Sequence, residues 1–187
     1  PKMMDAAILF MDGDVHRNYR TLVQPSFVPA KAIWWLDNWV KSTIDRLVDA
    51  LASDGEADLN TQFCAPIPML TITGSFGLTM EEALEVREAV TSDGKDQETI
   101  ARLLMPIIRA RREEPRDDLI SVLVQATVKG DDGTVQALND FEVLTFGFLL
   151  LAAGSGTTWK QMGITLLALL QRPELMDAIR EDPSMMR

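Results

Sequence analysis

A long apolar stretch at residues 141–170 constrains the fold of this chain most, and a single small, hydroxyl-rich patch interrupts it. The patch reads Ala-Ala-Gly-Ser-Gly-Thr-Thr and occupies residues 152–158. A glycine inside a helix costs about 1 kcal/mol relative to alanine. Gly154 and Gly156 therefore predict a local distortion or a flat group lying against the backbone, with close helix packing through small residues as the alternative. The patch is the first candidate for chemistry.

Composition narrows the class of protein. With 187 residues and 47% hydrophobic content, the chain is long enough for one globular domain with a core. A net charge of −10 argues against a nucleic-acid partner, because phosphate binding depends on clustered Lys and Arg. The lone cysteine, Cys64, excludes an internal disulfide and fits a reducing compartment, so we expect a cytoplasmic protein. The sequence has no Cys-x-x-Cys motif or histidine-rich cluster, so we expect no metal site made of protein ligands alone.

The apolar content does not predict a membrane protein. The longest apolar run, residues 146–153, is shorter than the roughly 20 residues that span a bilayer. Lys160 and Gln161 interrupt the apolar stretch after that run. The first residues show neither a signal-peptide pattern nor an initiator methionine, so we expect the chain to begin within a longer protein.

Helical periodicity dominates the sequence. We expect Asp14 to cap the first helix and Pro29 to open the second. The predicted helices cover residues 14–23, 29–54, 60–76, 80–90, 97–112 and 117–128, then 140–170, and a last one that begins at Pro173 and ends before Pro183. Asp132-Gly133 predicts a small hairpin within residues 129–138. The fold class is therefore all-α in the main, with at most a minor β-hairpin.

Three motifs resemble one known family. Residues 11–20, Met-Asp-Gly-Asp-Val-His-Arg-Asn-Tyr-Arg, look like the C helix of bacterial cytochrome P450 enzymes. Residues 115–119 match the start of their H helix, and residues 153–158 resemble the oxygen-binding groove of their I helix. Three motifs in the family's order are much more specific than any one of them. The resemblance implies a single, incomplete P450 domain segment over residues 1–187.

The resemblance does not extend to the whole family domain, which is roughly twice as long as this chain. The Glu-x-x-Arg pair and the loop of the haem-ligand cysteine have no counterpart in the sequence. Cys64 lies in Phe63-Cys64-Ala65-Pro66, which resembles the start of the E helix. We therefore interpret Cys64 as a buried structural thiol and not as the iron ligand.

His16 and Arg20 are separated by one helical turn, so both side chains lie on one face of the predicted helix. The resemblance supplies a shared partner, the two propionates of haem. Arginine can bind a carboxylate through two parallel hydrogen bonds, and histidine can donate one. The alternative is a solvated histidine and arginine on an ordinary helix.

The resemblance also assigns roles to hydroxyl groups. The family's counterpart of Thr157 lies near bound dioxygen and helps to deliver protons for cleavage of the O–O bond. An acidic residue usually precedes that threonine, and here the position is Gly156. Ser155, an ordered water chain or a substrate hydroxyl is the hypothetical substitute. The catalytic candidates are Thr157, Thr158 and Ser155.

Small and apolar residues complete the predicted site. By resemblance, Ala153 and Gly154 allow the oxygen and the haem face to approach the helix. Some of Leu149, Leu150 and Ala152 are expected to face an apolar substrate, although core packing explains each of them equally well. Residues 80–112 resemble the F and G helices that cover the substrate pocket, and they look short around residues 92–96.

The resemblance implies a haem-thiolate monooxygenase that inserts one oxygen atom into an apolar small molecule, with electrons from a ferredoxin-type or flavin redox partner. This chain alone, without the cysteine loop, is expected to be inactive. One alternative is a non-catalytic truncated helical fragment. A nucleotide-binding domain is a weaker one, with residues 146–151 as a strand before Gly154-Ser155-Gly156, because Trp159 takes the place of the third glycine.

We predict that the isolated chain self-associates or needs further protein segments, because the apolar helix at residues 141–170 would be partly uncovered. Size-exclusion chromatography with light scattering measures this directly. A monodisperse monomer with a cooperative thermal transition would contradict the prediction.

Overall fold

The computed structural model describes residues 8–91, 97–129 and 133–186, and helices make up most of them. The segments η4 and η5 are π-helical, and η2, η3 and η6 are 3₁₀ turns. The elements are η2 (Ile8–Phe10), α1 (Gly13–Val23), η3 (Gln24–Phe27), α2 (Pro29–Trp35), η4 (Leu36–Val40), α3 (Lys41–Asp54), η5 (Asn60–Cys64), α4 (Pro66–Ser75), α5 (Met80–Thr91), α6 (Gln97–Glu113), α7 (Leu119–Gln125), β1 (Thr127–Lys129), β2 (Val135–Ala137), α8 (Asp140–Leu170), α9 (Pro173–Glu181) and η6 (Pro183–Met186). The predicted fold class, mainly helical with a minor hairpin, is confirmed.

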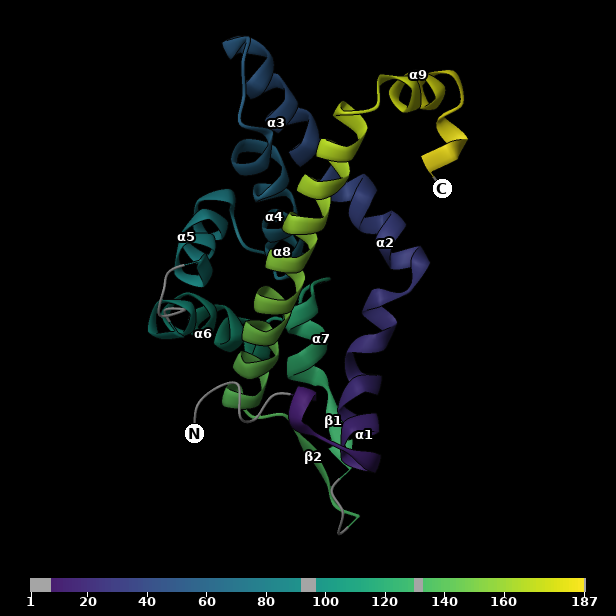
Figure 1. Cartoon of the computed structure of the whole chain (residues 1–187). Helices are drawn as coiled ribbons and strands as arrows, with labels where there is room; N and C mark the ends of the chain where they lie inside the picture. Colours follow the sequence, from purple (N-terminus) through teal and green to yellow (C-terminus); the bar gives the residue numbers. More distant parts are fainter. Residues whose placement is uncertain (1–7, 92–96, 130–132, 187) are drawn as a thin grey trace.

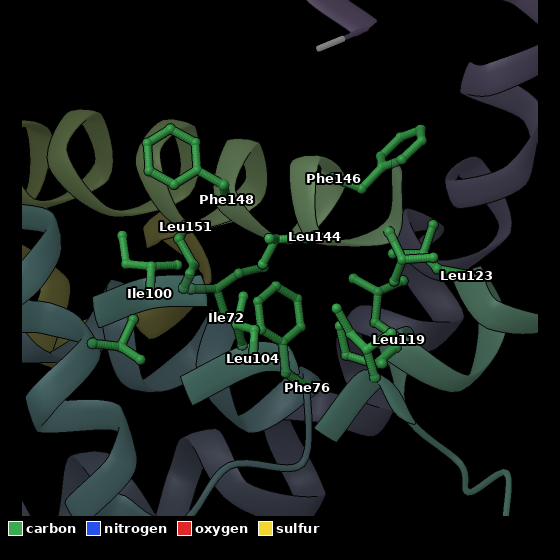
Figure 2. Packing of buried hydrophobic residues seen from close by; sticks show 14 of the residues in the cluster. Ile72, Phe76, Ile100, Leu104, Leu119, Leu123, Leu144, Phe146, Phe148 and Leu151 are labelled. Atoms are coloured by element: carbon green, nitrogen blue, oxygen red, sulfur yellow. The ribbon is translucent and has the colours of Figure 1, made fainter. Parts of the chain in front are cut away.

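Helix α8 runs through the middle of the molecule, with α5 and α6 on one side and α1 and α2 on the other (Figure 1). It packs against α4, α6 and α7. Its first half is buried: Val143, Phe148 and Leu151 are at most 1% exposed. Figure 2 shows Leu144 and Leu151 among apolar side chains from the neighbouring helices. The central apolar stretch of the sequence is thus the central helix of the fold.

A close approach of α8 to α6 depends on a missing side chain. A Cβ atom added at Gly147 would lie 3.1 Å from a methyl group of Leu104 and 4.0 Å from the ring of Phe76. Both of these side chains are fully buried. Glycine at this position therefore lets the two helices pack more closely than a larger residue would.

The start of α8 is defined by a capping box. The side chain of Asn139 accepts a hydrogen bond from the backbone N–H of Glu142 at 3.0 Å, and the Glu142 carboxylate accepts one from the backbone N–H of Asn139 at 2.7 Å. This arrangement satisfies two N–H groups that have no partner within the helix. The predicted start at Asn139 or Asp140 is confirmed.

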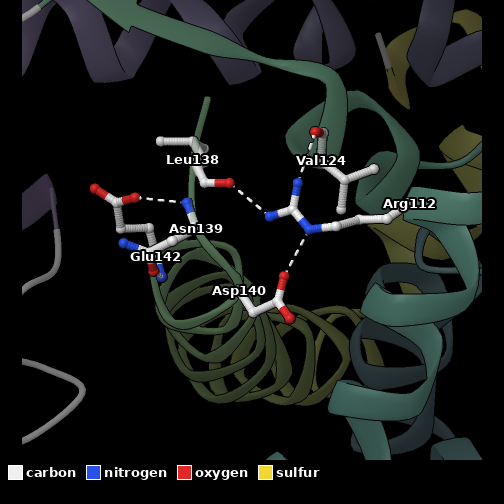
Figure 3. Close-up of polar contacts among 6 residues, drawn as sticks. All are labelled: Arg112, Val124, Leu138, Asn139, Asp140 and Glu142. Carbon is white, nitrogen blue, oxygen red and sulfur yellow. Dashed lines mark hydrogen bonds and ion pairs between the residues drawn. The ribbon is translucent and has the colours of Figure 1, made fainter. Parts of the chain in front are cut away.

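Arg112, in the last turn of α6, joins three elements at the same place (Figure 3). Its Nε donates to Oδ1 of Asp140 at 2.6 Å, which ties α6 to the first residue of α8. Its Nη1 donates to the Val124 carbonyl at 3.2 Å and its Nη2 to the Leu138 carbonyl at 2.5 Å. One side chain thus holds the end of α7 and the end of the hairpin beside the start of α8.

Several boundaries differ from the prediction by one to three residues, and the differences at α1 and α7 have a structural cause. The N-cap of α1 is Asp12, without a side-chain capping bond, and Asp14 lies inside the first turn, where it accepts a bond from Arg17 at 2.7 Å. Helix α7 ends at Gln125 and not at Val128, because residues 127–129 pair with residues 135–137 as an antiparallel hairpin. In the predicted hairpin turn, Asp132 falls outside the described residues, and Gly133 has φ +82°.

Helix α8 is long and apolar enough to cross a membrane when only length and composition are considered. Half of its most apolar window is buried inside the protein, and core helices often pass the same test. Within the described residues, a second candidate arises only if Asn60–Ser75 and Met80–Val90 are joined across a bend of 117°. The structure thus gives weak grounds for a membrane span.

A buried ion pair between Arg111 and Asp118 lies against the turn that follows α4. The Nε of Arg111 lies 2.5 Å from Oδ2 of Asp118, and both side chains are less than a tenth exposed. The other oxygen of Asp118 caps α7 by accepting from the backbone N–H of Ser121 at 2.8 Å. Gly77, with φ +75°, lies against this pair, since an added Cβ would be 2.8 Å from Arg111 Nη2 and 3.0 Å from Asp118 Oδ2.

We predict that Gly77→Ala destabilises the chain by about 3 kcal/mol, because left-handed backbone costs a non-glycine residue roughly 1–2 kcal/mol and the buried ion pair must also shift. Gly55→Ala is the matched control: Gly55 has φ +74° but nothing within 4 Å of an added Cβ. Urea denaturation measures both free energies of unfolding. Equal losses for the two variants would show that the contact with Arg111 and Asp118 has no effect.

Candidate functional site

An open pocket of about 760 Å³ lies between α1 and α8. His16 and Arg20 both line it, so the structure confirms that the two side chains share one face of α1. Leu150 lines it from α8. The rest of the lining is formed by residues from η2 to α2, namely Ile8, Leu9, Met11, Asp12, Gly13, Val23, Gln24, Phe27, Val28 and Pro29. The pocket is largely apolar and has its basic side chains on one helix.

Tyr19 attaches α1 to the first turns of α8. Its hydroxyl donates to Oε1 of Glu142 at 2.8 Å, and its ring stacks on Phe146 with centroids 5.9 Å apart. The neighbouring Asn18 donates from Nδ2 to the carbonyl of Lys129 at 3.1 Å, which ties α1 to β1. The sequence pattern does not indicate these contacts, because Tyr19 and Glu142 are 123 positions apart and nothing local marks them as partners.

The glycines of the small patch lie beside open space. A Cβ added at Gly154 or Gly156 would meet nothing within 4 Å. Within the described part of the chain, close packing between helices therefore does not explain the two glycines. The predicted distortion is also absent, because α8 remains one α-helix through residues 152–158. A flat group that lies against the backbone at Gly154 and Gly156 remains a prediction.

Ala153 and Gly154 lie about one turn beyond Leu150 on the same side of α8, and Thr157 lies about two turns beyond it, because positions separated by three, four or seven residues share a helical face. The side chain of Thr157 is exposed, and its Oγ1 donates to the carbonyl of Ala153 at 2.8 Å. Ala153 is exposed on the same side. The structure thus places Leu150, Ala153, Gly154 and Thr157 along one side of α8, continuing from the pocket.

The other predicted residues of α8 lie differently. Ser155 is 7% exposed, and its Oγ donates to the carbonyl of Leu151 at 2.6 Å, on the side that packs into the core. Thr158 is exposed and Ala152 is partly buried. Leu149 is 7% exposed and does not line the pocket of His16 and Arg20. The three hydroxyl groups therefore do not form one cluster.

Asn60 is hydrogen-bonded to α8 directly after the glycine-containing patch of residues 152–158. The Nε1 of Trp159 donates to the backbone carbonyl of Asn60 at 3.0 Å and to its Oδ1 at 2.8 Å. Gly163 leaves room for this contact, since an added Cβ would lie 2.9 Å from Asn60 Oδ1. The sequence pattern does not indicate this contact, and in it Trp159 is only a mismatch to the nucleotide-binding motif of the weaker alternative. That alternative is wrong, because residues 146–151 are helical and Gly154-Ser155-Gly156 lies within α8.

Cys64 is fully buried and lies away from the α1 pocket. It lines a separate apolar pocket of about 500 Å³, together with Leu59 and the second half of α8. Burial, and secondarily the negative charge of Asp58, raises the pKa of the Cys64 thiol and disfavours the thiolate. The interpretation of Cys64 as a structural thiol fits both observations.

The segment expected to cover a substrate pocket is formed by α5 and α6, which pack against each other. The expected shortening falls on residues 92–96, which lie outside the described part of the chain.

Comparison with known proteins decides the family. The family model named Cytochrome P450 matches residues 85–184. The chain belongs to the cytochrome P450 family. Among curated relatives, it is 32% identical to Cytochrome P450 107B1 of Saccharopolyspora erythraea, over 96% of this chain and 45% of that protein. It is 29% identical to Polyketide biosynthesis cytochrome P450 PksS of Bacillus subtilis, over 95% of this chain and 45% of that protein.

Solved P450 structures agree with the fold. Cytochrome P450 CYP109Q5 from Chondromyces apiculatus superposes with a TM-score of 0.82 and 30% identity, over 97% of this chain and 46% of that one. This P450 chain therefore spans about half the length of the relatives that it matches. The expectation of a partial P450 fold is confirmed, with α8 in the place of the long central helix.

Tyr19 provides a direct probe of the α1–α8 contact, because it is the only tyrosine in the sequence. Burial first, then its hydrogen bond to Glu142 and the charge of Glu142, raise the pKa of Tyr19 to about 12. We predict that tyrosinate, followed by ultraviolet absorbance, forms in the folded chain near that pH, about two units above an unfolded tyrosine.

Because the folded-state pKa is the higher one, the contribution of Tyr19 to stability is full below about pH 10 and is lost as the pH rises towards about 12. Glu142→Gln removes the charge and should lower the titration midpoint. Circular dichroism recorded in parallel shows whether the chain is still folded. A midpoint near 10 in the folded wild-type chain would contradict the contact.

Proposed function

We propose that this chain forms the central part of a haem-dependent monooxygenase that acts on an apolar small molecule. The observation that carries the proposal is the pocket in which His16 and Arg20 of α1 meet Leu150 of α8. Basic side chains on one edge and apolar side chains on the walls suit a flat apolar cofactor with two carboxylates. The haem proteins of the P450 family support the same assignment.

The residues of the pocket fit haem in two respects. Arg20 and His16 would hold the propionates, since a guanidinium binds a carboxylate through paired hydrogen bonds and an imidazole donates one more. Ala153 and Gly154 would lie against the cofactor, because their side of α8 is uncovered. When bound, haem supplies the redox chemistry that splits dioxygen and inserts one oxygen atom into the substrate. The thiolate ligand must come from outside this chain, because its one cysteine is buried elsewhere.

We assign proton delivery to Thr157. Its hydroxyl donates to the Ala153 carbonyl, so its oxygen stays free to accept a hydrogen bond from water. The space beside Gly156 could hold that water where the family usually has an acidic side chain. Thr158 is the exposed neighbour and a secondary candidate. Ser155 would have to give up its bond to Leu151 and leave the core side of the helix to take part.

The remaining parts of the proposal concern the whole protein. Leu150 would contact the apolar substrate, whereas the buried Leu149 and the partly buried Ala152 lie outside the pocket lining and would contribute less. A ferredoxin-type or flavin protein would supply electrons, and the bacterial relatives support a cytoplasmic location. The isolated chain would be inactive, and the exposed Ile164, Leu167 and Leu170 in the second half of α8 support its self-association.

The absorption spectrum of the reduced, carbon monoxide-bound state tests the proposal, recorded on the complete natural polypeptide that contains this chain. A red-shifted Soret band of the thiolate type is the expected result. Absence of this band, with haem available during expression, would overturn the proposal and favour a non-catalytic helical fragment.

We predict that Thr157→Ala in the complete enzyme increases the hydrogen peroxide released per product formed by roughly tenfold, which is below the range of about 10²–10⁴-fold that a general acid or base typically contributes, because water can partly replace the lost hydroxyl. The comparison uses the substrate identified by product analysis. Thr165→Ala is the matched control, because Thr165 is an exposed threonine of α8 whose Oγ1 makes the same kind of bond, to the Gln161 carbonyl at 2.9 Å. An unchanged ratio in Thr157→Ala would remove Thr157 from the mechanism.

A further inference from the structure

We propose that Tyr19 is a positioning residue for the cofactor: through Glu142 and Phe146 it holds α1 at the place on α8 where His16 and Arg20 can bind the haem propionates. The inference rests on the proposed function, because it concerns the same pocket. It assigns to Tyr19 no contact with haem. Its effect is exerted through the two basic side chains.

The arrangement of α1 supports this division of roles. At about 100° per residue, Arg20 lies roughly 40° to one side of His16 and Tyr19 roughly 60° to the other. Asn18 points roughly opposite to His16. One side of α1 thus lines the pocket, Tyr19 beside that side contacts α8, and Asn18 on the opposite side contacts β1.

The attachment consists of two different interactions with α8. The Tyr19 hydroxyl donates to the Glu142 carboxylate at 2.8 Å, and hydrogen bonds to charged groups are stronger than neutral ones. The ring stacks on Phe146, which fixes the distance between the two helices at this point. Glu142 is itself fixed, because its other oxygen accepts from the backbone N–H of Asn139 in the capping box.

The geometry of α8 explains why this contact matters for the pocket. Phe146 and Leu150 are one helical turn apart and lie on the same side of α8. Phe146, on which Tyr19 stacks, therefore lies one turn before Leu150, which forms a wall of the pocket. A shift of α1 along α8 would change the distance from His16 and Arg20 to that wall, and a rigid cofactor between them would be held less well.

The test measures the rate at which haem leaves the complete natural polypeptide for apomyoglobin, which binds it very tightly. Tyr19→Phe keeps the ring stacked on Phe146 and removes only the bond to Glu142. We expect haem to leave about five to ten times faster. Asp14→Asn is the control on the same helix, because Asp14 and its partner Arg17 are largely exposed, and the rate should not change.

A double-mutant comparison separates positioning from general stabilisation. If Tyr19 acts through His16 and Arg20, then Tyr19→Phe should have no further effect on the rate in a chain that already carries His16→Ala and Arg20→Ala. An equal effect in both backgrounds would overturn the inference. The free energy of unfolding, measured on the same variants without haem, shows how much of any change is loss of fold.

The outcomes also separate this inference from the function on which it rests. If the His16→Ala, Arg20→Ala double variant loses haem no faster than wild type, the assignment of the propionate-binding residues fails. If that variant loses haem quickly while Tyr19→Phe behaves as wild type, the assignment stands and the positioning role of Tyr19 is wrong.

Discussion

The packing of the first half of α8 into the core is the constraint on which the rest of the structure depends. Its buried side chains fix the rotation of the helix, and Gly147 lets it approach Leu104 of α6 closely. The capping box at Asn139 and the bridge from Arg112 fix its start. With the rotation and the start both fixed, the direction of every later residue on α8 follows from helical geometry.

The fixed rotation of α8 decides which hydroxyl groups of the glycine-containing patch are buried and which are exposed. Ser155 falls on the packed side and bonds to a backbone carbonyl there, whereas Thr157 falls on the open side that continues from Leu150. Ser155 and Thr157 are only two positions apart in the sequence, yet the first is buried and the second is exposed. Helix α1 is attached to the open side through Tyr19, so the basic residues and Thr157 border the same side of α8.

The helices could be predicted well, because apolar spacing and Pro or Gly boundaries are local properties of the chain. The end of α7 was predicted wrongly because a helical pattern does not reveal strand pairing: residues 127–129 leave the predicted helix and pair with residues 135–137. The same holds for the site. The shared face of His16 and Arg20 followed from their spacing, but the bonds from Tyr19 to Glu142 and from Trp159 to Asn60 join residues that are far apart in the chain.

The sequence by itself determined the helical class, the central position of residues 141–170 and, through three motifs in order, the P450 family. These depend on the order and local spacing of residue types. Only the tertiary structure decided that Gly154 and Gly156 lie beside open space, that Ser155 and Thr157 lie in different surroundings, and which side of α8 carries α1. The physical reason is that a helical pattern defines faces, whereas the burial of one face depends on packing against segments distant in the sequence.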